Sequence, residues 1–294
     1  MSVSSPESGS RQVEAPEHPA ASRWSAPTAT ATGAVGRRAR TEDRRPRRLP
    51  GVERTHTRPA EPRTAVVWAA LREETDRRGT NLVVIDVGGG TGGFAVPLAE
   101  AGHRVTVVDA SPDALAALTR RAAEAGVAGR VAAVQGDGDR LAELVPAGSA
   151  DLILCHSLLE VVDDPAGVVG ALASTLRPGG AVSVVVANRA AAVLSRAMSG
   201  HLGVAAALLS DPAGRAGAGD KLRRRFDPAG ATALLGTAGL VVERIQGVRV
   251  VADLVPGAVA DADPDTLLAL ELIAAELPPY RDIATQLHLF ARKP

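Results

Sequence analysis

The stretch "VVIDVGGGTGGFAVPLAEAGHRVTVVDAS" at residues 83–111 restricts the possible folds of this chain more than any other stretch. An apolar run is followed by a glycine cluster, a helical stretch, a second apolar run and then Asp109. This order predicts a strand–helix–strand unit of a parallel sheet. Gly88, Gly90 and Gly93 satisfy G-x-G-x-x-G, which lets backbone approach a ligand closely, and Asp109 follows where such folds place a ribose-binding acid.

The rest of the chain, from residue 64 onward, alternates between helical and strand patterns, and Ser111 followed by Pro112 predicts a helix start. We expect helices at 64–74, 93–102, 111–126, 164–180, 227–239 and 263–277. We expect strands at 81–87, 104–110, 130–137, 150–157, 181–189, 240–250 and 284–294, and an irregular segment at 189–227. The alternation predicts an α/β fold with a doubly wound, mostly parallel seven-stranded sheet of Rossmann-like type.

The first 62 residues differ from the rest in composition. They are rich in Ser, Pro, Ala, Arg and Glu, lack periodic apolar positions and contain the run "RRARTEDRRPRR". We therefore expect residues 1–62 to form a disordered extension and residues 63–294 to form one α/β domain. The net charge of zero hides a basic extension and an acidic remainder. A basic extension can contact nucleic acid, and it can equally be a solvated segment.

Several classes of protein are disfavoured by what the sequence lacks. It has no run of 18 apolar residues and no apolar signal region near the start, so we expect a cytoplasmic protein with no membrane partner. The single cysteine, Cys155, lies in an apolar stretch and is expected to be a small buried residue. We expect no metal site, because His156 has no second His or Cys at ligand spacing.

Asp86 distinguishes between two kinds of ligand for the glycine loop. Its carboxylate, two residues before the first glycine, would repel the pyrophosphate of a dinucleotide but would suit an ammonium group. S-adenosylmethionine carries an ammonium group and a sulfonium, and no phosphate. The position of Asp86 therefore favours S-adenosylmethionine as the cofactor.

Five blocks in order resemble the class I S-adenosylmethionine-dependent methyltransferases: "VVIDVGGGTGG", "VTVVDAS", "VQGDGD", "DLILCHSLLEVVDDP" and "LRPGG". A narrower resemblance covers nearly all of residues 63–294. The segments "RTAVVWAAL", "LRPGGAVSVVVANRAAAVLSRAMSGHL", "GVRV" and "HLFARKP" are similar to the bacterial tRNA 5-carboxymethoxyuridine methyltransferase family. That resemblance implies tRNA as a partner and a carboxylate on a modified wobble uridine as the methyl acceptor.

The resemblance also implies a set of residues that bind the cofactor. Asp109 is expected to accept hydrogen bonds from both ribose hydroxyls, and Asp137 with Gly138 to form the adenine-binding turn, although Asp139 could take the part of Asp137. Arg63 would reach the cofactor carboxylate, unless it is a solvated charge, and His156 would contact the cofactor, unless it is a structural histidine. The complete set is Arg63, Asp86, Gly88, Gly89, Asp109, Asp137, Gly138 and His156. Glu160 and the pair Asp163–Asp164 are expected to cap the following helix rather than to act in chemistry.

A carboxylate acceptor is already ionised at neutral pH and needs no general base, so we assign no catalytic residue. It needs instead a cation to position it, for which Arg provides two parallel donors. Arg249 in "GVRV" is the first candidate, Arg189 the second, and Asn188 could orient the acceptor. Two alternatives remain open at this point: a methyltransferase for a small-molecule acid or a secondary metabolite, suggested by the 2% aromatic content and neutral charge, and a non-catalytic module that binds a nucleotide cofactor.

Overall fold

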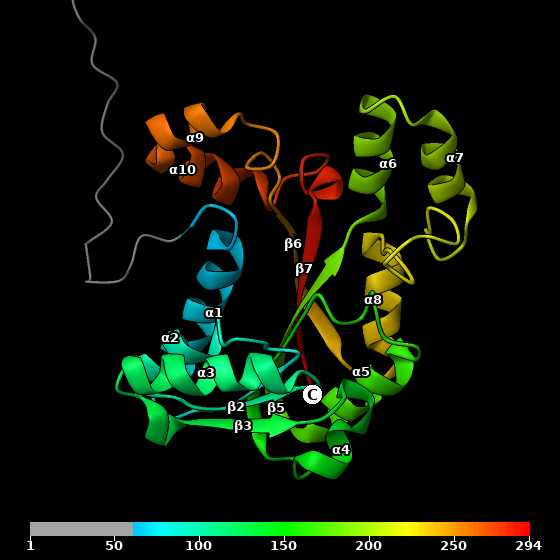
Figure 1. Ribbon diagram of the computed structural model, residues 1–294. Coiled ribbons are helices and arrows are strands. Elements are labelled where there is room, and N and C mark those ends of the chain that lie inside the picture. The colour runs from blue at the N-terminus through cyan, green and yellow to red at the C-terminus, as the bar shows by residue number, and fades with distance from the viewer. Residues whose placement is uncertain (1–60) are drawn as a thin grey trace, which may run out of the picture. The chain divides into compact units, whose positions relative to one another are not determined.

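The computed structural model describes residues 61–294, which contain a seven-stranded sheet in the order β3-β2-β1-β4-β5-β7-β6 (Figure 1). The predicted extension at 1–62 lies outside the described residues except for its last two. The strands are β1 (Val83–Val87), β2 (Arg104–Asp109), β3 (Val131–Gln135), β4 (Ala150–His156), β5 (Leu176–Ala187), β6 (Val241–Val248) and β7 (Gln286–Arg292).

The sheet has a parallel half and an antiparallel end. β3, β2, β1, β4 and β5 run parallel to one another, whereas β7 pairs antiparallel with both β5 and β6. Strand β6 therefore points the same way as β5, and the carboxyl ends of all strands but β7 share one edge. This is the predicted doubly wound fold, in which ligands bind beyond that carboxyl edge.

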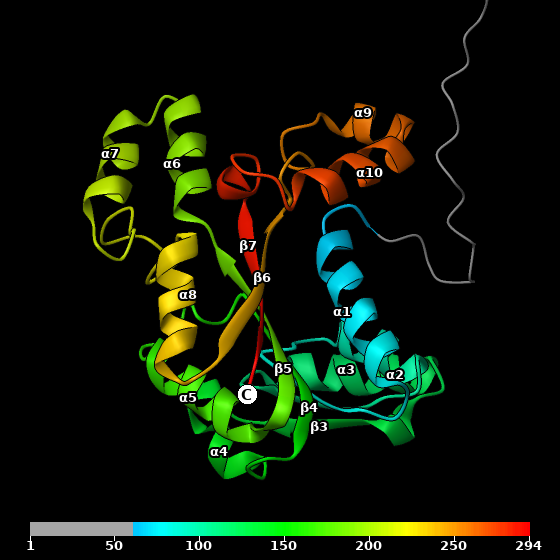
Figure 2. The ribbon, with the colours of Figure 1, turned by 180° about the vertical axis from the view of Figure 1, so that it is seen from behind.

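Helices cover both faces of the sheet, and each face has its own core (Figures 1 and 2). One core includes Val84, Leu152, Leu154 and Val185 and packs under α1 (Ala65–Arg78), α2 (Ala95–Glu100) and α3 (Pro112–Glu124). The other includes Ile85, Ile153 and Val184 and packs under α4 (Leu141–Leu144), α5 (Pro165–Thr175) and α8 (Pro228–Thr237). Alternate residues of one strand enter opposite cores because strand side chains have a period of two.

The helix termini follow the predicted signals, with one difference. Ser111 caps α3 by accepting from the Ala114 N–H at 3.2 Å, with Pro112 at the first helical position. Helix α5 ends at Thr175, however, before the Pro178 and two glycines that were predicted to end it. Strand β5 begins already at Leu176, and a Cβ at Gly180 would lie 2.8 Å from the Arg177 carbonyl oxygen. The glycines of "LRPGG" thus serve the strand rather than the end of the helix.

Two helical insertions rise from the carboxyl edge, at the top of Figure 1. The first, α6 (Arg189–Met198) and α7 (Leu202–Ser210), occupies the segment for which we expected irregular structure, so that expectation is wrong. The second, α9 (Gly257–Ala262) and α10 (Pro264–Ala274), lies between β6 and β7. Helix α6 is exposed or half-buried along its whole length, although its apolar residues recur at helical spacing.

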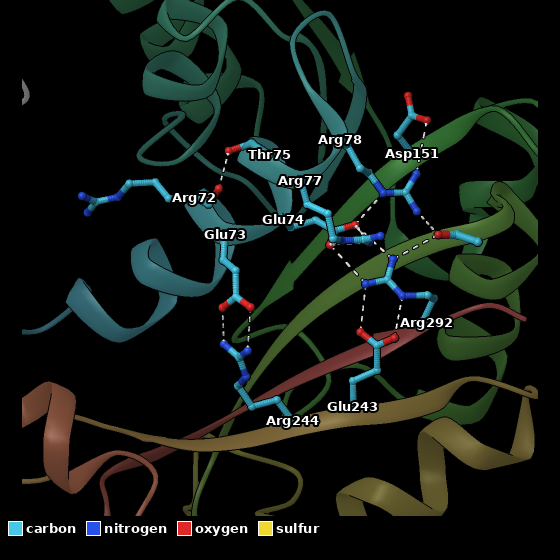
Figure 3. A network of polar contacts seen from close by, with 11 residues as sticks. Arg72, Glu73, Glu74, Thr75, Arg77, Arg78, Asp151, Glu243, Arg244 and Arg292 are labelled. Carbon is cyan, nitrogen blue, oxygen red and sulfur yellow. Dashed lines mark hydrogen bonds and ion pairs between the residues drawn. The ribbon is translucent and has the colours of Figure 1, made fainter. Parts of the chain in front are cut away.

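A network of charged side chains attaches α1 to the antiparallel strands (Figure 3). The buried Glu74 carboxylate accepts hydrogen bonds from Arg77, Arg78 and Arg292, and Arg292 also pairs with Glu243. A carboxylate taken out of water is stabilised only when such donors surround it. The network therefore determines where α1 lies relative to β6 and β7.

Within residues 61–294, no helix is long and apolar enough to cross a membrane.

Candidate active site

The loop after β1 forms one wall of the candidate site. Gly88 has φ +73° and donates its N–H to the Val108 carbonyl oxygen at 2.7 Å, which attaches the loop to β2. Gly90, at φ +54°, donates its N–H to Asp109 Oδ2 at 2.8 Å. Positive φ values are strained for residues with a Cβ. The two glycines therefore allow a turn whose backbone faces the carboxyl edge.

Asp86 lies directly beneath this loop. Its side chain is 2% exposed, and its Oδ2 has no hydrogen-bond partner among residues 61–294. Burial, reinforced by the nearby charge of Asp109, raises the pKa of Asp86 to about 7. A Cβ at Gly89 would lie 2.5 Å from this carboxylate, so the loop can close over Asp86 only with glycine there. The arrangement presents a buried acceptor at the point where we predicted a cationic ligand group.

Asp109 ends β2 with its carboxylate held in place. Oδ1 accepts from the Ser111 N–H at 2.9 Å, and Oδ2 accepts the bond from Gly90 described above. Each carboxylate oxygen has a second lone pair. Ser111 supplies the cap of α3, so Asp109 is not needed there, and its predicted contact with ribose hydroxyls stays a prediction with suitable geometry.

The turn after β3 brings Gly138 against the loop that follows β4. Gly138 is buried, and a Cβ there would lie 2.9 Å from a methyl carbon of Leu158. Asp137 and Asp139 flank it, and both are exposed. A side chain at position 138 would therefore collide with Leu158, so only glycine fits there, and both carboxylates are accessible for the predicted adenine contact.

His156 lies at the tip of β4 and is neutral. Its Nε2 is 2.9 Å from Ser183 Oγ, while its buried Nδ1 finds no partner in the described part of the chain. Burial lowers the pKa of His156 to about 3. The edge of the ring meets Phe94, with centroids 4.7 Å apart, and Phe94 in turn stacks on Trp68 at 4.9 Å. Phe94 therefore lies next to His156, with Trp68 stacked on Phe94, which the low aromatic content did not reveal.

Near the end of β6, Asp253 lies between Arg63 and Arg249, two of the arginines predicted for the site. Its Oδ1 is 3.5 Å from Arg63 Nε and its Oδ2 is 3.5 Å from Arg249 Nε. Thr285 Oγ1 donates to the same Oδ2 at 3.0 Å. Arg249 Nε is buried and makes no hydrogen bond to any residue from 61 to 294. Sequence reasoning missed Asp253, whose signal was its position four residues after Arg249.

Glu271 of α10 orients the turn that carries Arg249. Its carboxylate, fully buried, accepts from the backbone N–H groups of Val250 at 3.0 Å and Val251 at 2.6 Å, and also from Ala252. Arg249 itself has φ +58°, a conformation that needs support from its surroundings. A single acid in an amphipathic helix predicts a surface charge, so nothing in the sequence pattern indicated this role.

Asn188 and Arg189 are occupied by structural contacts. Asn188 caps α6 through the Ala190 N–H, and its Nδ2 donates to the carbonyl oxygens of Asp282 at 2.9 Å and Ala284 at 2.8 Å. Arg189 Nη2 donates to Asp227 Oδ2 at 2.6 Å. These bonds favour a structural role over the predicted contact of either residue with the acceptor.

The acidic residues in the loop after β4 were expected to cap the following helix, and the structure agrees for Asp164 but not for Glu160. Asp164 caps α5, as predicted, by accepting from the Gly167 N–H at 3.0 Å. Glu160 does not cap that helix; it is buried, burial raises its pKa, and its Oε2 is unpaired among the residues described.

Cys155 is fully buried, and burial raises the pKa of its thiol. In the described part of the chain, no cluster of three or more His, Cys, Asp or Glu side chains could hold a metal ion.

Comparison with known proteins identifies the family. A family model described as a methyltransferase domain matches residues 84–180. The tRNA 5-carboxymethoxyuridine methyltransferase of Escherichia coli (strain K12) is 31% identical over 234 residues, which cover 79% of this chain and 88% of that protein. The chain belongs to the class I S-adenosylmethionine-dependent methyltransferases.

Two further similarities are informative for this methyltransferase. A ubiquinone biosynthesis O-methyltransferase of Xanthomonas axonopodis pv. citri (strain 306) is 34% identical over 166 residues, 56% of this chain and 64% of that protein. A solved S-adenosylmethionine-dependent methyltransferase from Mesorhizobium loti matches with a TM-score of 0.53 at 22% identity, covering 78% of this chain and 98% of that one. The structural similarity confirms the predicted fold.

The residues at the tips of β1 to β4 fit S-adenosylmethionine, the cofactor of this class. The partnerless Asp86 oxygen offers an acceptor beneath the glycine loop, and the close packing at Gly89 and Gly138 is possible only because a Cβ is missing. The same edge carries the carboxylates of Asp109 and Asp137. These features suit a ligand with an ammonium group and ribose hydroxyls, and they provide no cation for a pyrophosphate.

Proposed function

We propose that this methyltransferase esterifies a carboxylate, and that its substrate is 5-carboxymethoxyuridine in tRNA. The observation that carries the proposal is the Asp253 carboxylate between the guanidinium groups of Arg63 and Arg249, at 3.5 Å from each Nε. Both contacts are longer than a charge-assisted hydrogen bond, for which about 2.7–2.9 Å is usual. The position between the two guanidinium groups therefore suits a carboxylate, and the two arginines contact the Asp253 carboxylate only at these longer distances.

In the proposed reaction Arg249 presents its guanidinium to the substrate carboxylate, and Asp253 moves aside or shares the cation. Glu271 keeps the turn at 250–252 in place, so that the guanidinium is oriented before the substrate arrives. When bound, S-adenosylmethionine supplies the methyl group on a sulfonium, and transfer to a carboxylate oxygen leaves the sulfur neutral. No proton has to move, because the acceptor is ionised at neutral pH. The enzyme contributes mainly the alignment of the two reactants.

The second part of this proposal concerns the cations that would contact tRNA. In the basic run "KLRRR", Arg223 pairs with Asp163, Arg225 pairs with Asp220, and Arg224 donates to the carbonyl oxygens of Leu159 and Val162. These arginines are engaged within the domain. We therefore propose that the arginine-rich residues 1–62, a separate extension from the domain at 63–294, contribute phosphate contacts. A tRNA substrate would also agree with the predicted cytoplasmic location.

A small hydroxyl compound or acid is the second candidate substrate. It is favoured by the similarity to a ubiquinone biosynthesis O-methyltransferase and by apolar side chains exposed on the helical insertions, among them Met198, Leu202 and Val259. The third reading, a non-catalytic module, has lost its support because the chain belongs to an enzyme class.

The test is single-turnover methylation with labelled cofactor. Wild-type enzyme is incubated with tRNA that carries 5-carboxymethoxyuridine, with the same tRNA lacking the carboxylate, and with a panel of small acids and phenols. We expect label only in the carboxylate-bearing tRNA. Label in a small phenol or acid, with none in either tRNA, would exclude the proposed substrate and leave the second candidate.

A further inference from the structure

A chain of polar side chains leads from His156 to the surface at Glu276. His156 Nε2 is 2.9 Å from Ser183 Oγ, which is 2.9 Å from His288 Nε2. His288 Nδ1 is 3.1 Å from Gln246 Oε1, and Gln246 Nε2 donates to Glu276 Oε1 at 3.0 Å. Five side chains are thus joined by four contacts, all within ordinary hydrogen-bond length.

This polar chain crosses four neighbouring strands within one core. His156, Ser183, His288 and Gln246 belong to β4, β5, β7 and β6, which are adjacent in that order in the sheet. Ser183 and His288 are 0% exposed and Gln246 is 5% exposed, while Glu276 is exposed. Buried polar groups are costly unless they are hydrogen-bonded. Four such groups in the sheet core are therefore a specific arrangement and not a by-product of packing.

The direction of every hydrogen bond follows from the exposed end. The Glu276 carboxylate offers only acceptors, so the amide group of Gln246 that faces it is the NH2 group. Gln246 Oε1 then accepts, and His288 must donate from Nδ1. Burial lowers the pKa of His288 and of His156 to about 3, so each ring is neutral and has one N–H.

The same reasoning continues to His156. Because His288 carries its hydrogen on Nδ1, its Nε2 is an acceptor, and the single hydroxyl hydrogen of Ser183 is directed to it. Ser183 Oγ can then only accept from His156, so the hydrogen of His156 lies on Nε2. The opposite tautomer would require Ser183 to donate to two imidazoles with one hydrogen, and one buried contact would be lost.

We propose that Ser183, His288, Gln246 and Glu276 are positioning residues that hold His156 as its Nε2–H tautomer, so that Nδ1 accepts a hydrogen bond from the bound cofactor. Nδ1 is buried, and no described residue donates to it. The choice of the cofactor as donor rests on the proposed function, because a carboxylate acceptor has no hydrogen to give. If the acceptor carried a hydroxyl instead, that hydroxyl would be the competing donor.

The tautomers can be read directly by NMR. Long-range proton–nitrogen correlation spectra of the full chain labelled with 15N-histidine distinguish the two neutral forms of each ring. Variants His156→Asn and His288→Asn assign the two signals. We expect opposite tautomers, with hydrogen on Nε2 in His156 and on Nδ1 in His288. Hydrogen on Nδ1 of His156, or the same tautomer in both rings, overturns the proposal.

Affinity for S-adenosylhomocysteine, the demethylated cofactor, tests whether the tautomer matters. Ser183→Ala should weaken its binding by about three- to tenfold in calorimetry, the range for losing one hydrogen bond. Thr175→Val is the matched control, because Thr175 is also 0% exposed and its hydroxyl bonds to Ala171 of its own helix. We expect this control to bind as the wild type does. Equal affinity of Ser183→Ala and the control overturns the proposal.

A double variant shows whether Ser183 acts through His156. Ser183→Ala combined with His156→Asn should bind no more weakly than His156→Asn alone, whereas multiplied losses would contradict the proposal. Gln246→Met, near the exposed end, replaces Ser183→Ala if that variant does not fold. The calorimetry contains no methyl acceptor, so an incorrect tRNA substrate leaves its outcome unchanged. Unaltered cofactor affinity with slower methylation of a hydroxyl compound would instead overturn both proposals.

Discussion

At the tips of β1 and β4 polar side chains keep hydrogen-bonding atoms without a partner, whereas at the tips of β5 and β6 the polar side chains are engaged by other parts of the chain, with Arg249 Nε in an ion pair and without a hydrogen bond. Asp86 and His156 each have an atom that no described residue contacts. Asn188 and Arg189 are instead engaged by Asp282 and Asp227, and Arg249 lies next to Asp253. The difference suggests that the cofactor side is preformed, while the acceptor side must exchange internal contacts for substrate contacts.

The largest expected effect concerns Asp86, and it tests the claim that the cofactor side keeps a buried polar atom without a partner. Its pKa of about 7 in the folded enzyme lies above the ordinary value of 3.8, so the folded state holds a proton that the unfolded state has released between these pH values. The free energy of unfolding should therefore fall as pH rises from about 4 to 7, by up to about 4 kcal/mol. Asp86→Asn should remove this part of the pH dependence.

Denaturant unfolding of both proteins at several pH values, without ligand, measures the effect. The quantity to compare is the difference in unfolding free energy between Asp86→Asn and wild type, which should grow with pH in favour of the variant. A constant difference from pH 4 to pH 8 would show that Asp86 is not the strained buried carboxylate that the structure indicates.

The next effect concerns Arg249 on the acceptor side. Arg249→Ala should slow methyl transfer to a carboxylate by roughly 30- to 1,000-fold, or about 2–4 kcal/mol, because it removes the charged donors that position the acceptor. Lys should restore only part of the rate, since it lacks the planar pair of donors. Affinity for S-adenosylhomocysteine should stay as in the wild type. Full activity of Arg249→Ala in single-turnover assays would remove Arg249 from the site.

A smaller effect sharpens the claim that the glycine loop is preformed. Gly89→Ala places a Cβ 2.5 Å from the Asp86 carboxylate, whereas at Gly93 a Cβ meets no described atom within 4 Å. Overpacking of this kind costs about 1–3 kcal/mol, so Gly89→Ala should lose about five- to 150-fold in cofactor affinity. Gly93→Ala is the control and should bind normally. Equal affinities measured by calorimetry would mean that the loop adapts.

The smallest effect tests the contacts that attach α1 to the antiparallel strands. Arg244 donates to Glu73 at 2.7 and 2.9 Å, but both side chains are more than a third exposed. Glu73→Gln should therefore change the unfolding free energy by less than about 1 kcal/mol. Glu74→Gln, at the buried centre of the network in Figure 3, should cost clearly more. Thermal unfolding that ranks the two variants the other way would contradict this account.

The fold was predictable because its signals are local. The strand–glycine–helix–strand order of residues 83–111, the Ser111 cap and the alternating apolar runs each act within a few residues, and all of them agree with the observed sheet. Helices α6 and α7 were missed because the mixed composition of residues 189–227 was taken for irregular structure, although the apolar residues of α6 recur at helical spacing. Helix α9 has only six residues, too few for a periodic pattern.

The residues predicted for the cofactor side could be located from the sequence itself, since Asp86, Asp109 and His156 lie at the ends of strands that the sequence predicts and the glycines follow the first of them. The acceptor side was decided by tertiary structure alone. Asp253 meets Arg63 across the fold, and Glu271 holds a turn some 20 residues earlier in the chain. Behind His156 on the other side, Ser183 likewise meets His288 more than 100 residues later. The physical reason is that the alternation of buried and exposed residues is a local property of the sequence. The partner of a buried polar group depends instead on which distant segment packs against it.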